Sequence, residues 1–138
     1  MKLIITISLV LILNQMQYLS MQTNVNRTFT QHEIEFEKLY GTWYVKQILI
    51  NGKEDLENFP TNNDELTFNP NMTIISVDKT YDLVDKGTWK IKNPDLIIIN
   101  TEDESTIFQI LKLTSKELET KMISDDVDMI IKYKRSIE

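Results

Sequence analysis

The chain lacks cysteine altogether and has a single histidine among its 138 residues. Without cysteine, disulfide bonds, thiol catalysis and zinc–thiolate sites are excluded, and so is the cysteine-linked anchor of bacterial lipoproteins. The one histidine, His32, has no second histidine with which to share a metal ion. Most enzyme chemistries are therefore hard to build, and we expect no catalytic residue, no metal site and no cofactor.

Basic residues are in the minority. Lys and Arg number 15 against 21 Asp and Glu, which gives a net charge of −6. A nucleic-acid surface needs clustered positive charge, so nucleic acid is not an expected partner. The acidity is interpreted mainly as a contribution to solubility. The contents of 41% hydrophobic and 26% charged residues are ordinary for a globular protein, and the length suits one domain.

Long apolar runs are also scarce. The main one extends from Leu3 to Leu13, directly after the basic Lys2. It is shorter than the roughly 20 residues that a membrane-spanning helix needs. A basic start, a short apolar core and a polar continuation predict a signal peptide over residues 1–20.

The end of this signal is less sharply marked. A cut after Ser20 would leave the bulky Tyr18 where a small residue is preferred, so later cleavage and retention as an anchor stay open as alternatives. Residues 21–29 are polar and aperiodic and are expected to form a flexible lead-in to a domain over residues 30–138. The chain is then an exported protein, periplasmic or secreted, with no stable membrane span after cleavage.

A short helix is predicted at the start of the domain. The segment Thr30-Gln31-His32-Glu33 fits a capping box, with Thr30 as the N-cap and Glu33 reaching back to it. The helix is expected to continue to about Leu39. His32 then lies in its first turn, where a solvated role is more plausible than that of a ligand or a base.

From Tyr40 onward the pattern changes to short strands separated by turn residues such as Asn51-Gly52 and Asn69-Pro70-Asn71. Most connections are very short, and short connections join antiparallel neighbours. Closing such a meander removes its two edges. We therefore predict an all-β, antiparallel up-and-down eight-stranded barrel with a short N-terminal helix. Its strands are expected near residues 41–50, 64–69, 72–78, 81–92, 95–100, 105–113, 116–123 and 127–134.

Alternate residues of a strand share a face, which assigns an inner and an outer side. In the last strand, for example, Met129, Ile131 and Tyr133 share one parity. When the same alternation is applied to the other strands, the residues assigned to the inner side are mostly apolar. The residues that this assignment offers for contact with a ligand are Gln47, Gln109, Thr120, Tyr133 and Trp89.

The segment Leu39-Tyr40-Gly41-Thr42-Trp43-Tyr44-Val45 resembles the opening of a lipocalin-type domain, in which a short helix leads into a strand that begins Gly-x-Trp. A second Gly87-Thr88-Trp89 and the later Ile110-Leu111-Lys112-Leu113-Thr114 stand at familiar spacings. Together these features are similar to the small bacterial lipocalin-like domains over about residues 37–135. The resemblance implies a closed barrel in which Gly41 allows a tight entry and Trp43 plugs one end.

The resemblance also implies a role for a basic residue after the last strand. Larger lipocalins place an arginine across the tryptophan as a cation–π lid. Arg135 has the inward parity of Tyr133 and is favoured for this role, with Lys134 as the competing candidate.

Three functions are compatible with these features. A barrel of this size encloses little more than its own side chains or one small apolar ligand, which makes a small-ligand carrier the preferred function. The alternative is a filled barrel that serves as an envelope-associated interaction module, with Tyr44, Ile48 and Ile50 as an outer contact patch. An enzyme ranks last, because the assigned inner side holds no Asp, Glu, Lys or His. The acidic segments at residues 102–104 and 125–128 are interpreted as solvated hairpin tips.

Overall fold

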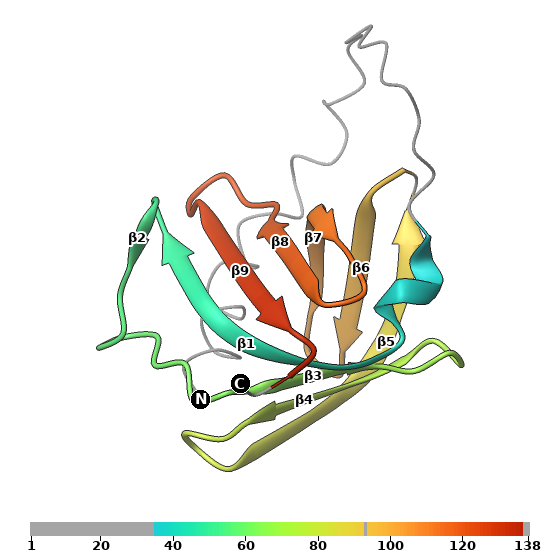
Figure 1. Ribbon diagram of the computed structural model, residues 1–138, viewed down its shortest axis with the longest axis horizontal. Coiled ribbons are helices and arrows are strands. Elements are labelled where there is room, and N and C mark those ends of the chain that lie inside the picture. The colour runs from blue at the N-terminus through green and yellow to red at the C-terminus, as the bar shows by residue number, and fades with distance from the viewer. Residues whose placement is uncertain (1–34, 93, 137–138) are drawn as a thin grey trace, which may run out of the picture.

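The computed structural model describes residues 35–92 and 94–136. Within them one antiparallel sheet curls round and closes on itself (Figure 1). The predicted all-β, eight-stranded up-and-down barrel is confirmed. Its strands are β1 (Gly41–Ile50), β3 (Glu65–Phe68), β4 (Thr73–Asp78), β5 (Leu83–Lys92), β6 (Leu96–Thr101), β7 (Ser105–Leu113), β8 (Glu117–Met122) and β9 (Met129–Lys134).

A further two-residue strand, β2 (Lys53–Glu54), extends the end of β1 as a hairpin. The turn between them is Asn51-Gly52, in which both residues have positive φ (51° and 77°). A two-residue hairpin turn of this kind needs the left-handed region twice, and Asn-Gly is the pair that adopts it most readily.

The helix predicted before the first strand can be compared with the structure only from residue 35 onward. In the described residues it is a single 3-10 turn, Phe36–Leu39, with Leu39 fully buried. The predicted capping box at residues 30–33 lies outside the described residues. No helix in the part of the chain that the structure describes is long and apolar enough to cross a membrane.

Closure of the barrel depends on β1. Its first residues pair with β3, from Gly41 opposite Phe68, and its later residues pair with β9, up to Ile50 opposite Met129. Figure 1 shows β1 as a long curved strand running between these two neighbours. Because β9 pairs with β1, the barrel strands have no exposed edge at this seam.

The connections alternate between two ends of the barrel. The turns β3–β4, β5–β6 and β7–β8 share one end with the 3-10 turn, and we call this the capped end. The remaining connections, at residues 51–64, 79–82, 102–104 and 123–128, lie at the opposite end, which we call the loop end. The core between them is apolar. Its fully buried large side chains include Trp43, Trp89, Phe68, Ile48, Ile97, Leu118, Met122 and Met129.

The inner face of β1 differs from the prediction in its second half. The pairing with β9 shifts register between Val45 and Gln47, which marks a β-bulge at Lys46. A bulge adds one residue to its strand and exchanges the two faces beyond it. Ile48 is therefore buried, and Gln47 pairs with Lys132 on the outer face.

The predicted faces of β7 are wrong from the start of the strand. Thr106, Phe108 and Ile110 are the buried residues, so Ile107 and Gln109 face outward. A second bulge, between Ile110 and Lys112, then restores the inward direction for Leu113 opposite Leu118. Both faces of this strand carry apolar residues, and alternation therefore could not choose between them.

Candidate functional site

The capped end is built around Trp43, whose side chain is fully buried. Its indole Nε1 donates to the backbone oxygen of Leu39 at 2.9 Å, which satisfies the one polar group that the ring brings into the core. Gly41 has φ +106°, and a Cβ built there would lie 2.7 Å from Nη1 of Arg135. A larger residue at position 41 is therefore opposed both by the backbone and by the lid above it.

Arg135, rather than Lys134, lies across this tryptophan. Its guanidinium carbon is 3.9 Å from the centroid of the Trp43 ring. The same group donates to the backbone oxygen of Tyr40 at 2.6 Å and to that of Lys38. Burial lowers the pKa of Arg135, but a guanidinium stays charged in proteins. Lys134 is exposed and pairs across the sheet with Tyr44.

Trp89 supports the same end from β5. Its ring makes edge contacts with Phe68 and Tyr40, at centroid distances of 5.3 and 6.1 Å. Its Nε1 donates to the backbone oxygen of Asn69 at 3.1 Å. Trp89 does face inward as expected, and its polar atom is already bonded within the protein, so it offers a ligand an apolar surface only.

Two of the predicted polar residues do meet inside the barrel. Thr120 and Tyr133 are 3% and 5% exposed and stand on the inner faces of the neighbouring strands β8 and β9. Burial raises the pKa of Tyr133, and a hydrogen-bonding contact of its phenol with the Thr120 hydroxyl opposes part of that rise. Thr120 Oγ1 nevertheless has no hydrogen bond of ordinary geometry in the described structure.

Gln47 and Gln109 are not part of this interior, and their predicted inward position is wrong. The β1 bulge turns Gln47 outward beside Lys132. Gln109 stands on the outer face of β7, where its Nε2 donates to Oδ2 of Asp95 at 2.8 Å. This bond anchors the β5–β6 turn and leaves the amide no role inside the barrel.

The structure also places polar residues inside that the sequence assignment missed. Ser76 pairs with Asp85, and both share the inner face with Ile74 and Gly87. Asp78 continues the same row and is 2% exposed. Counting alternate residues onward from Ile74 would have found Ser76 and Asp78. The inner surface is thus apolar at the capped end and partly polar on the wall formed by β4 and β5.

A second buried carboxylate, Asp64, stands beside Asp78 at the loop end. Asp64 Oδ1 accepts from the backbone N–H of Lys79 at 2.8 Å. Asp78 Oδ1 accepts from the N–H groups of Thr80 and Tyr81 at 2.9 and 3.0 Å. Burial raises the pKa of Asp64, and the charge of Asp78 adds to the rise. The two carboxylates therefore hold the β4–β5 turn against the start of β3.

The acidic segments of the loop end behave as expected for hairpin tips. Glu102, Asp103, Asp125 and Asp126 are exposed, and Asp128 pairs with Lys121 at 2.9 Å. No group of three or more His, Cys, Asp or Glu within residues 35–92 and 94–136 could hold a metal ion.

The outer contact patch of the alternative function is not formed. Ile48 is buried and Ile50 packs against the core, because the β1 bulge turns both inward. Tyr44 alone remains on the outside, with Lys79 Nζ 5.4 Å above its ring.

This arrangement of a Gly-x-Trp entry, an arginine lid and a closed antiparallel barrel agrees with a comparison against known families. The model of the lipocalin-like domain matches residues 39–120, more than half of the chain. The chain belongs to the lipocalin-like domain family. No curated protein matches it. Lipocalin-like proteins are typically non-enzymatic binding proteins.

Proposed function

We propose that this lipocalin-like domain binds one small, mainly apolar ligand inside its barrel. The observation that carries the proposal is the buried pair of hydroxyls of Thr120 and Tyr133, in which Thr120 Oγ1 makes no hydrogen bond of ordinary geometry in the described structure. A polar head group placed there would receive the bond that the protein does not supply. The surrounding apolar residues would hold the rest of the ligand.

The test is a binding titration followed by the fluorescence of Trp43 and Trp89, with fatty acids, retinoids and sterols as probes. Thr120→Val keeps the shape of the side chain and removes its hydroxyl, so we expect about a tenfold loss of affinity for a ligand with a polar head group. Gln109→Ala, on the outer face, is the matched control and should leave the affinity unchanged. Equal affinity of the Thr120 variant and the native chain would contradict the proposed position of the head group.

The alternative, a filled barrel that works through protein contacts, is favoured by the large aromatic side chains of the capped end. Native mass spectra of the chain purified from the exported fraction separate the two functions. An excess mass that disappears on delipidation supports a carrier. A clean mass that remains clean after incubation with the same probes would favour the interaction module.

Export itself is part of this proposal and is supported by the short apolar run at residues 3–13. Denaturing mass spectrometry of the exported protein should give a chain shortened by about the first 20 residues, as expected for a cleaved signal. Recovery of the full-length chain in the membrane fraction would instead show that the segment is retained as an anchor.

A further inference from the structure

A depression on the outside of the barrel lies behind the strands that carry Thr120 and Tyr133, and Tyr133 is among its lining residues. It has a volume of about 190 Å³ and lies over β1, β9, β8 and the end of β7. Four of its lining residues form one row across the sheet, in which Gln47, Lys132, Glu119 and Lys112 are successive strand partners. Buried neighbours in the same strands, such as Ile131, face the core, so this row belongs to the outer surface.

Two β-bulges flank the depression. One displaces Lys46 from the pairing of β1 with β9, and the other displaces Leu111 from the pairing of β7 with β8. Bulges bend their strand and redirect side chains, and they are frequent beside functional sites. Here they stand on either side of the Lys132–Glu119 pair, in the two strands that border it.

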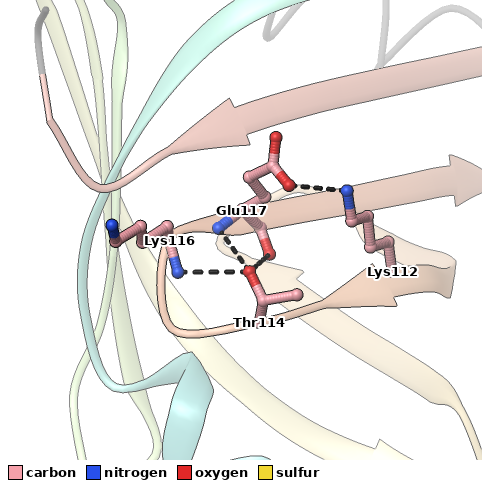
Figure 2. Close-up of polar contacts among 4 residues, drawn as sticks. All are labelled: Lys112, Thr114, Lys116 and Glu117. Carbon is pink, nitrogen blue, oxygen red and sulfur yellow. Dashed lines mark hydrogen bonds and ion pairs between the residues drawn. The ribbon is translucent and has the colours of Figure 1, made fainter.

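The depression has an excess of positive charge, whereas the whole chain is negatively charged. Its lining contains four lysines and two glutamates, whereas the protein carries a net charge of −6. Lys112 is neutralised by Glu117 at 2.5 Å, an interaction that lowers the pKa of this glutamate. Figure 2 shows this pair, together with Thr114, whose Oγ1 accepts from the backbone N–H of Glu117 at 2.9 Å and so fixes the turn.

Counting the whole lining, four lysines face two glutamates, and Lys132 stands at the centre of them. Lys132 is half-buried in the middle of the row, and its ammonium makes no ion pair or hydrogen bond within residues 35–92 and 94–136. Lys134 lies two residues further along β9, opposite Glu117, and Lys46 stands at the bulge of the neighbouring β1, where its Nζ donates to Oδ1 of Asn63 at 2.8 Å. Glu119 is the one carboxylate here outside the Lys112 pair. The depression thus keeps an excess of positive charge around Lys132.

We propose that this depression binds a phosphate group, with Lys132 as the central ligand and Lys134, Lys46 and the amide of Gln47 around it. Lysine ammonium groups are compact charges suited to a phosphate, whose oxygens can accept from several of them at once. The phosphate is carried either by a small soluble molecule or by the headgroup of an anionic lipid. Glu119 opposes an anion, so the affinity is expected to be modest and to fall as salt is raised.

The experiment titrates the full chain with glycerol phosphate in one arm and with vesicles of phosphatidylglycerol in the other, both at low ionic strength. Amide chemical shifts of β8 and β9 report the first arm and co-sedimentation reports the second. Saturable binding in either arm, weakened at least tenfold by Lys132→Gln, is the expected result, and the arm that responds identifies the source of the phosphate.

The matched control is Lys90→Gln, which removes an exposed lysine from the outer face of β5 and changes the net charge equally. Its binding should stay within twofold of the native chain. No saturable binding in either arm would overturn the proposal, and so would an equal loss in the two variants, because that result reflects net charge alone. Thermal unfolding of both variants establishes that they are folded when they are compared.

Discussion

At the scale of single residues, three residues at the capped end depend on one another for their positions. Gly41 leaves space for the Arg135 guanidinium, and that guanidinium covers the Trp43 ring. The ring in turn is oriented by its hydrogen bond to Leu39. A substitution at any one of these positions would therefore disturb the other two, although Arg135 is far from Gly41 and Trp43 in the sequence.

Replacing Arg135 tests the strength of this lid. Arg135→Ala removes the cation–π contact and two charged hydrogen bonds to backbone oxygens, so the free energy of unfolding should fall by about 2–3 kcal/mol. Urea denaturation followed by tryptophan fluorescence measures it. Lys134→Ala, one residue earlier and exposed, should change it by less than about 0.5 kcal/mol. Similar losses in both variants would show that the lid contributes no more than a surface lysine.

Asp64 provides a prediction of pH dependence. Burial raises its pKa in the folded protein above the ordinary value, so the folded state holds the proton to higher pH than the unfolded state does. This group therefore favours folding at low pH, and its contribution is lost as pH rises from about 4 through the raised pKa. Asp64→Asn keeps an acceptor for Lys79 N–H but cannot ionise.

The measurement is the free energy of unfolding of the native chain and of Asp64→Asn at several values between pH 4 and 7. The variant should gain stability relative to the native chain as pH rises. Asp103→Asn, in the exposed β6–β7 connection, should show no such trend. Parallel curves for the native chain and the Asp64 variant would mean that the two states bind the Asp64 proton equally.

At the scale of strands, the sequence predicted where each strand begins and ends better than which of its faces points into the barrel. All eight barrel strands begin and end within about two residues of their expected ranges, because turn residues such as Asn51-Gly52 mark the boundaries chemically. The inner faces were correct for β8 and β9 and wrong for half of β1 and for most of β7. In β1 the error comes from a bulge, which exchanges the faces and which Lys46 does not signal. In β7 it comes from the apolar residues on both faces, which leave alternation nothing to choose by.

The prediction of the candidate site was affected in the same way, because it depended on which residues face inward. Thr120, Tyr133 and Trp89 stand where alternation placed them, whereas Gln47 and Gln109 lie outside. The depression around Lys132 could not be predicted at all, since it arises from two bulges and a row of four strands. Its members are distant in sequence, and each alone is an ordinary surface residue.

Gly87 tests the contact between two strands. A Cβ at this position would lie 2.1 Å from the backbone oxygen of Asn100, so β5 and β6 would have to separate. Gly87→Ala should therefore lower the free energy of unfolding by about 3 kcal/mol, as strong overpacking does. Gly52→Asn is the control, because nothing lies within 4 Å of a Cβ there and asparagine accepts a positive φ. Thermal denaturation should rank the two variants clearly, and a Gly87 variant as stable as the control would contradict the steric argument.

At the scale of the whole molecule, charge is divided between the two ends. The loop end carries the acidic connections at residues 102–104 and 125–128, and the lysines of the depression lie toward the β7–β8 turn of the capped end. The net charge of −6 therefore hides a local excess of the opposite sign. Long-range attraction of an anion would be weak, and recognition would depend on contacts made within the depression.

The pairing of β1 with β9 also determines how the barrel would respond to tension. The strands are antiparallel, and the beginning of β1 lies beside the end of β9, with Tyr44 opposite Lys134. A force that pulls the two ends of the domain apart would act along the inter-strand hydrogen bonds, which run perpendicular to the strands. It would break the Arg135 contacts first and then the hydrogen bonds between β1 and β9, one after another. A barrel closed in this way is mechanically compliant at its seam, whatever its resistance to heat or urea.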